Sequence, residues 1–95
     1  MDPETRQKFE EYTGIGYYQD LSYLDLEQQI NIMAKVYAFH IMKAFKMNKK
    51  DKKKYIIETI EYIHDLTENR FTEANENDMT EKAMMLVKTA SYSLK

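Results

Sequence analysis

Between Tyr17 and Lys95 the chain contains neither glycine nor proline, and this long stretch without a helix breaker is what most constrains its fold. The only proline is Pro3, and the only glycines are Gly14 and Gly16. Glycine and proline are the residues that helix interiors disfavour most. The alternation of apolar and polar residues that indicates strands is absent from the sequence. The sequence therefore predicts an all-α protein.

The size of the chain, 95 residues, is that of one domain, and such a domain can fold without disulfides or metal ions. Because there is no cysteine, disulfides and thiolate sites are excluded. The first twenty residues lack the basic and apolar regions of a signal peptide, and no apolar run approaches the roughly 18 residues of a membrane span. We therefore expect one cytoplasmic helical domain over residues 1–95, with no membrane partner.

A short first helix is predicted over residues 3–13. Asp2 is a favoured N-cap, and Gly14 supplies a C-terminal stop. A helix of this length is marginal by itself in water. We therefore expect it to dock on the rest of the protein through Phe9 and Tyr12.

A second, longer helix is predicted over residues 25–47, where Asp25 and Gln28 form a capping box. Apolar side chains surround this helix almost completely. Such a helix is either central in its bundle or shared with a second molecule. The apolar side chains opposite its main stripe are Ile32, Phe39 and Met42.

A third helix is predicted over residues 52–69, although no glycine or proline separates it from the second. In one continuous straight helix, the two apolar stripes would point about 110° apart at the ordinary helical step. One partner surface could not bury both stripes. We therefore predict a turn near residues 48–51.

A fourth helix is predicted over residues 79–94, because Asp78 and Glu81 form another capping box. The preceding segment, residues 67–78, is acidic and rich in asparagine, and we expect it to be mostly loop. The fold predicted from these elements is a compact antiparallel bundle of three to four helices. Its surplus of apolar side chains favours a homodimer. The residues expected to hold the two copies together are Ile32, Phe39, Met42, Met84, Met85 and Tyr92.

Half of the fourteen basic residues lie within residues 43–54. Such a basic cluster can contact the phosphates of nucleic acid. However, the chain has only two arginines and a pI of about 5.7, far from the composition of a dedicated nucleic-acid domain. We favour a solvated hairpin tip or a contact with an acidic partner, and keep nucleic-acid binding as the alternative. The lysines expected to contact phosphates are Lys49, Lys50, Lys52, Lys53 and Lys54.

Tyrosines gather in one segment of the sequence: four of the eight lie within residues 12–23. Tyrosine offers a large, rigid contact area at low entropic cost and is enriched at binding surfaces. We therefore expect Tyr17, Tyr18 and Tyr23 to be aromatic anchors for a protein partner. The alternative is that these rings fold back to cover the bundle.

Little in the sequence indicates catalysis or metal binding. Glu61 and His64 form a single Glu-x-x-His motif, whereas a di-iron helical bundle needs two such motifs and two further glutamates. His40 lies near the apolar stripe of its helix, where a core histidine with one hydrogen bond is expected. No nucleophile has a motif around it, and the glycines form no phosphate-binding loop. We predict no catalytic residue, no cofactor and no metal site.

The function predicted from these features is that of a small, non-enzymatic, intracellular binding or regulatory protein, which docks onto another protein, onto itself, or onto both. Compact helical inhibitors and adaptors of this kind are common among phage and mobile-element products. Bacteriocin-immunity bundles are similar in size and helix content, although no motif connects this chain to them. An immunity-type bundle is therefore a second alternative, after nucleic-acid binding.

Overall fold

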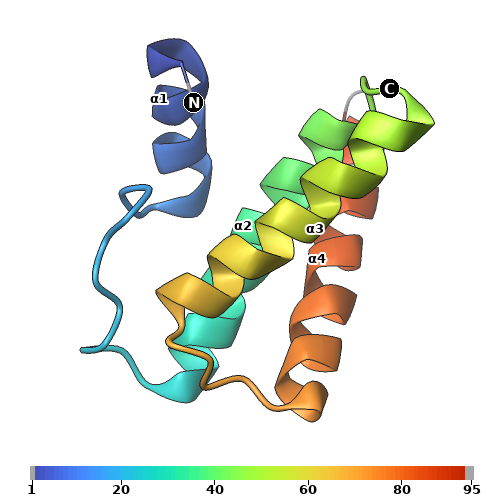
Figure 1. The fold of residues 1–95 in the computed structure, drawn as a ribbon. Helices are drawn as coiled ribbons and strands as arrows, with labels where there is room; N and C mark the ends of the chain where they lie inside the picture. Colours follow the sequence, from blue (N-terminus) through green and yellow to red (C-terminus); the bar gives the residue numbers. More distant parts are fainter. Residues whose placement is uncertain (1, 94–95) are drawn as a thin grey trace.

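In the computed structural model, which describes residues 2–93 and the side chains of residues 2–90, the chain forms four α-helices and no strand (Figure 1). The prediction of an all-α fold is confirmed over this part of the chain. None of the four helices is both long enough and apolar enough to cross a membrane. The helices are α1 (Pro3–Thr13), α2 (Leu26–Ala44), α3 (Lys49–Leu66) and α4 (Glu73–Ser93).

Helix α1 has the bounds that the sequence predicts. The Asp2 carboxylate accepts a hydrogen bond from the Thr5 N–H at 2.8 Å and so caps the first turn. Gly14, with φ of 77°, ends the helix in the left-handed conformation that glycine adopts without steric cost. Phe9 is fully buried and Tyr12 is half-buried, so the predicted docking face of this short helix is confirmed.

Helix α2 opens with the predicted capping box. The Asp25 carboxylate accepts the Gln28 N–H at 2.8 Å, and the Gln28 side chain accepts the Asp25 N–H at 3.1 Å. The helix ends at Ala44, before the predicted residue 47, because the chain tightens into a turn in which the Met47 N–H donates to the Ala44 carbonyl at 3.0 Å. The turn into α3 follows directly, close to the position that the apolar stripes predict.

Helix α3 begins and ends three residues earlier than the predicted span of 52–69. Its N-cap is Asn48 and not Asp51: the Asn48 side chain accepts the Asp51 N–H at 2.9 Å. At the other end, Glu68 and Asn69 have φ of 53° and 57°, in the left-handed region where a helix cannot continue.

Helix α4 begins at Glu73, so the prediction that residues 67–78 are mostly loop is wrong for the second half of that segment, and the helix predicted over 79–94 starts too late. Thr72 and Asn75 exchange two hydrogen bonds at this point. The Thr72 hydroxyl accepts the Asn75 N–H at 3.2 Å, and the Asn75 side chain accepts the Thr72 N–H at 3.0 Å. This reciprocal cap starts the helix before the capping box that the sequence suggested.

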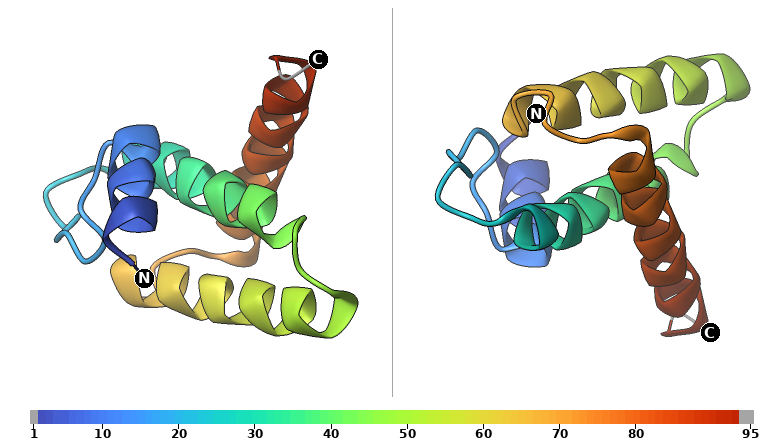
Figure 2. Two further views of the ribbon diagram at one scale, coloured as in Figure 1. Left: turned by 90° about the horizontal axis from the view of Figure 1, so that it is seen from above. Right: turned by 90° about the horizontal axis from the view of Figure 1, so that it is seen from below.

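Helix α2 is the centre of the molecule, since α1, α3 and α4 each pack against it. Helix α3 runs antiparallel along one side of α2, and α4 crosses α2 on another side (Figure 2). The radius of gyration is 13.0 Å, the value of about 13 Å expected for a compact domain of 100 residues. The central position of α2 explains why apolar side chains surround it. The largest fully buried apolar residues are Phe9, Leu21, Met33, Val36 and Ile63.

Candidate functional site

The connection between α1 and α2, residues 14–25, carries three of the tyrosines and is called the tyrosine loop here. Two buried side chains, Ile15 and Leu21, anchor it to the core. Gln19, between these two residues, forms hydrogen bonds within the loop. Its side-chain oxygen accepts the Gly16 N–H at 3.0 Å, and its side-chain nitrogen donates to the Tyr23 hydroxyl at 2.9 Å. Two buried side chains therefore attach the loop to the core, and hydrogen bonds of Gln19 link its two halves.

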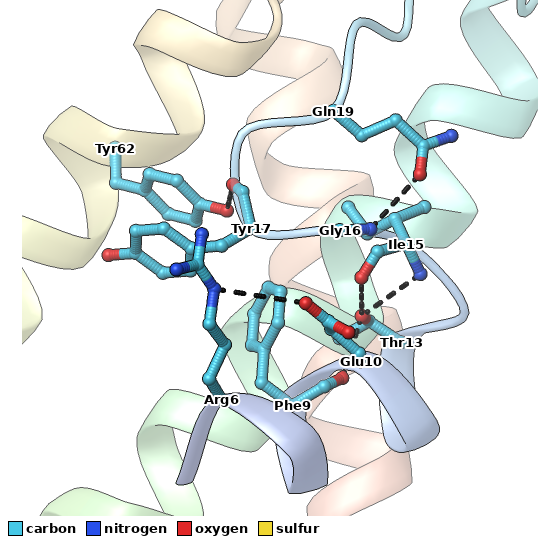
Figure 3. Close-up of polar contacts among 9 residues, drawn as sticks. All are labelled: Arg6, Phe9, Glu10, Thr13, Ile15, Gly16, Tyr17, Gln19 and Tyr62. Atoms are coloured by element: carbon cyan, nitrogen blue, oxygen red, sulfur yellow. Dashed lines mark hydrogen bonds and ion pairs between the residues drawn. The ribbon is translucent and has the colours of Figure 1, made fainter. Parts of the chain in front are cut away.

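Tyr17 points inward from this loop (Figure 3). Its ring stacks on the Tyr62 ring of α3, with centroids 4.4 Å apart, and packs edge-on against Phe9 at 5.4 Å. The Tyr62 hydroxyl donates a hydrogen bond to the Tyr17 backbone carbonyl, and the Arg6 guanidinium lies 5.9 Å from the centroid of the Tyr17 ring. Burial raises the pKa of both tyrosines. Of the three predicted anchors, Tyr17 is thus the one whose ring folds back onto the bundle.

Tyr18 and Tyr23 point outward, with 73% and 69% of their surfaces exposed. The Tyr18 ring stands edge-on to Tyr17 at 4.7 Å, so one of its sides rests on the buried aromatic cluster. The Tyr23 hydroxyl is held by Gln19. The tyrosine loop therefore carries two exposed tyrosine rings, at positions 18 and 23.

The apolar residues on the far side of α2, which were expected to contact a second copy, pack against the core of the same molecule. Ile32, Phe39 and Met42 are half-buried and pack against the hydrophobic core. Phe39 meets Phe9 of α1 edge-on, with centroids 5.4 Å apart. Contacts with α1 and the other helices therefore account for the partial burial of these side chains.

Of the six residues predicted to hold two copies together, two on α4 have exposed side chains. Met84 is 50% exposed and Met85 is 70% exposed, whereas the side chain of Tyr92 lies outside the described residues. A groove of about 400 Å³ runs beside Met85 between α2 and α4. Its other lining residues are Asn31, Ala34, Lys35, Lys82, Leu86 and Thr89.

The lysine cluster forms the first turns of α3, as a basic tip at one end of the molecule. Lys52 is half-buried, with its ammonium 5.9 Å from the centroid of the Phe45 ring, and the other four lysines are exposed. Among the described residues, none of the five lies within 4 Å of a carboxylate oxygen. The five are Lys49, Lys50, Lys52, Lys53 and Lys54.

The residues of the Glu-x-x-His motif do not converge. Glu61 is exposed beside the basic tip, in a shallow groove that it shares with Lys53 and Lys54. His64 instead contacts α4, where its Nε2 lies 2.5 Å from a carboxylate oxygen of Glu76. Within the part of the chain that the structure describes, no three histidine, aspartate or glutamate side chains gather where they could hold a metal ion.

One feature was missed by the sequence analysis, a cavity of about 290 Å³ between α2, α3 and the tyrosine loop. Buried His40 forms part of its wall, and its Nδ1–H donates to the Val36 carbonyl at 2.8 Å. Burial, and secondarily the Lys43 ammonium, lowers the pKa of His40. Burial raises the pKa of Tyr55 to about 12. The cavity is lined by Tyr17, His40, Lys43, Tyr55, Glu58, Thr59 and Tyr62.

The sequence contains a weak signal for this cavity. Tyr55, Thr59 and Tyr62 follow one another at i, i+4 and i+7, which places them on one face of a helix. That spacing is equally typical of a core stripe. This face of α3 lines a cavity because the tyrosine loop, some forty residues earlier in the chain, lies close to it.

Comparison of the chain with protein-family models, with curated proteins and with solved structures gave no match. No relative therefore informs the activity, ligands or partners of this protein. Its function is inferred below from the side chains that the fold presents.

Proposed function

We propose that this protein is a non-enzymatic binding module that docks onto a protein partner through Tyr18 and Tyr23. The observation that supports this proposal is the exposure of both rings on a loop that two buried side chains attach to the core. Tyrosine offers a large, rigid contact area at low entropic cost and is enriched at binding surfaces. Tyr17, which packs inward, supports Tyr18 from behind and is not itself an anchor.

The bracing of the loop is what makes it suitable for binding. Association costs free energy for each side chain and loop that becomes ordered. In the tyrosine loop Ile15 and Leu21 are already buried, and Gln19 already bonds to Gly16 and Tyr23. Binding would therefore require little further ordering of the loop, so less conformational entropy would be lost on association.

The charges around the two rings favour a partner with a basic rim. Asp20 lies in the loop, and a hydrogen bond from the Ser22 N–H lowers the pKa of its carboxyl, so it is ionised at neutral pH. Asp25 and Glu27, at the start of α2, are also exposed. Complementary charge accelerates association and selects among partners.

The test is a pull-down of partner proteins from an extract of the native host. The wild-type protein and a Tyr18→Ala/Tyr23→Ala variant are used as baits and compared. We expect the variant to fold normally and to lose the captured partner. The matched control is Phe45→Ala/Ile57→Ala, which removes two exposed apolar side chains elsewhere on the surface and should keep that partner. A double tyrosine variant that retains every partner would contradict the proposal.

We propose in addition that two copies associate through Met84 and Met85. Methionine is over-used at adaptable binding surfaces. Both side chains are exposed, and Met85 lines the apolar groove between α2 and α4. Sedimentation equilibrium should give a dimer for the wild-type protein and a monomer for Met84→Gln/Met85→Gln. A wild-type monomer at high concentration would refute this proposal and leave the tyrosine proposal untouched.

A second candidate function, nucleic-acid binding by the basic tip, is favoured by one observation: the five lysines make no ion pair with the described carboxylates. If they contact phosphates, affinity should fall steeply with salt, because each neutralised phosphate releases counterions. A titration with duplex and single-stranded DNA at two salt concentrations decides the matter. Absence of binding at low salt removes this candidate.

A further inference from the structure

The cavity between α2, α3 and the tyrosine loop has mainly aromatic walls. Tyr17 comes from the loop, His40 from α2, and Tyr55 and Tyr62 from α3. The rings of Tyr17 and Tyr62 are stacked with planes 11° apart, and those of His40 and Tyr55 have centroids 5.5 Å apart. Flat walls of this kind favour a flat guest, because ring stacking adds to the gain from apolar burial.

His40 supplies a hydrogen-bonding group to the lining of this cavity. His40 is only 3% exposed, and its Nδ1 is committed to the Val36 carbonyl on its own helix. The Nε2 atom on the opposite edge of the ring has no hydrogen-bond partner among the described residues. His40 lines the cavity. In a neutral imidazole whose Nδ1 carries the proton, Nε2 is the hydrogen-bond acceptor.

Two opposite charges lie at the edge of the same cavity. Lys43 belongs to α2 and Glu58 to α3, and both side chains line it. They do not pair with each other, nor does either form an ion pair within 4 Å with any described residue. The lining of the cavity thus includes one ammonium, from α2, and one carboxylate, from α3.

We propose that this cavity binds a small aromatic zwitterion of the class of the free aromatic amino acids. The ring of the ligand lies among the tyrosine rings and donates an N–H or O–H to Nε2 of His40. Its carboxylate pairs with Lys43, and its ammonium pairs with Glu58. The cavity, at about 290 Å³, is at the lower end of the roughly 300–1,000 Å³ range of small-molecule sites, which suits a compact ligand of this kind.

The geometry ranks related ligands. Tryptophan and tyrosine carry a ring donor for Nε2 of His40, and phenylalanine does not. A site built to hydrogen-bond a ligand group rejects the analogue that lacks it, because the buried group of the site is left unpaired. The N-acetyl amides of the same amino acids keep the ring but lose both charges, so they should bind weakly.

The experiment is a titration of the full-length protein with free L-tryptophan, L-tyrosine, L-phenylalanine and the N-acetyl amide of tryptophan. Because the protein contains no tryptophan, the fluorescence of free L-tryptophan reports its own binding. Shifts in amide NMR spectra locate the site for all four compounds. We expect saturable binding of tryptophan and tyrosine, with shifts at residues 40, 55, 59 and 62.

Variants of the two charged residues test the pairing without entering the core. Lys43→Met and Glu58→Gln should each raise the dissociation constant by about tenfold or more, as loss of a charge-assisted contact does. Lys53→Met and Glu61→Gln make the same chemical changes at side chains of the adjoining shallow groove that do not line the cavity. These two variants should leave the dissociation constant within about twofold.

Three results would overturn the proposal. One is the absence of saturable binding by tryptophan and tyrosine up to millimolar concentration. Another is binding that Lys43→Met and Glu58→Gln both leave unchanged. The third is binding as tight for the N-acetyl amide as for the free amino acid. Because Tyr18 and Tyr23 do not line the cavity, none of these results bears on the proposed docking function.

Discussion

The hydroxyl of Tyr62 donates a hydrogen bond to the backbone carbonyl of Tyr17, and the two rings stack with centroids 4.4 Å apart. The two residues lie 45 positions apart in the sequence, one on the tyrosine loop and the other on α3. Burial raises the pKa of Tyr62, so its hydroxyl remains a donor at every physiological pH. This pair fixes the loop to α3 and forms one wall of the aromatic cavity.

Replacement of Tyr62 by phenylalanine keeps the stacked ring and removes only the hydrogen bond. We expect Tyr62→Phe to lower the free energy of unfolding by about 0.5–1.5 kcal/mol, the usual net contribution of one hydrogen bond. Urea denaturation followed by circular dichroism measures it. The matched control is Tyr37→Phe, since Tyr37 is half-buried against the core and its hydroxyl has no partner among the described residues. A loss as large for Tyr37→Phe would show that the bond to Tyr17 contributes nothing particular.

Phe9 is the side chain by which α1 is attached to the rest of the molecule. It is fully buried and its ring meets those of Tyr17, Phe39 and His40 at centroid distances between 5.4 and 5.7 Å. Truncation of a buried phenylalanine to alanine typically costs about 3–5 kcal/mol. We therefore expect Phe9→Ala to unfold α1, and in a domain of this size to unfold most of the chain.

The milder Phe9→Leu variant keeps this prediction measurable, because it retains apolar volume at the site. Its free energy of unfolding should lie between those of the wild type and Phe9→Ala. Amide hydrogen exchange should accelerate first in α1 and in the tyrosine loop. If exchange in α1 were as fast in the wild type as in Phe9→Ala, the short helix would not be held by this ring.

Thr72 determines where α4 starts. Its hydroxyl accepts the Asn75 N–H, and loss of a threonine N-cap usually costs about 0.5–2 kcal/mol. We expect Thr72→Ala to destabilise the protein by this amount and to fray residues 73–77, so that the helix begins at the Asp78 capping box instead. Thr72→Ser, which restores the hydroxyl, should recover most of the stability. Carbon chemical shifts of residues 73–77 distinguish the two variants, and unchanged helical shifts in Thr72→Ala would contradict the assignment.

The sequence predicted those features of the fold that depend on neighbouring residues. Asp2 and Gly14 bound α1, and Asp25 opens α2, because caps act within one turn of the helix. Where two caps compete locally, as Asn48 does with Asp51, the predicted start at residue 52 took Asp51 as the N-cap and was wrong. The outcome there depends on backbone geometry that a pattern does not contain.

Features that depend on distant residues were not predictable in the same way. Apolar side chains around α2 fitted both a central helix and a shared one, and only the packing of three helices on it distinguishes the two within one molecule. The inward orientation of Tyr17 and the outward orientation of Tyr18 follow from contact with Tyr62, far along the chain. The aromatic cavity needs residues of three separate elements, so no single segment indicates it.

His40 makes the stability of the protein sensitive to mild acid. Burial lowers the pKa of its imidazole below the ordinary value of about 6.5, and Lys43 acts in the same direction, although the bond to Val36 opposes them in part. The unfolded chain has the ordinary pKa, so below about pH 6.5 the unfolded state binds a proton that the folded state does not. The free energy of unfolding contributed by this group is therefore complete above that pH and falls as the pH is lowered.

The titratable groups that line the cavity with His40 from the other elements are Tyr17, Tyr55, Tyr62 and Glu58. The three tyrosine hydroxyls remain neutral below pH 8 and so do not titrate in this window. Urea denaturation between pH 7.5 and 5.5 should show a decline in the wild type that is clearly flatter in His40→Gln, whatever the absolute stability of the variant. His64→Gln serves as the control, because it removes the other histidine, which contacts Glu76 near the surface. Parallel pH profiles for the wild type and His40→Gln would mean that His40 has the same pKa in the folded and unfolded states, and that its burial against the cavity wall does not keep it neutral.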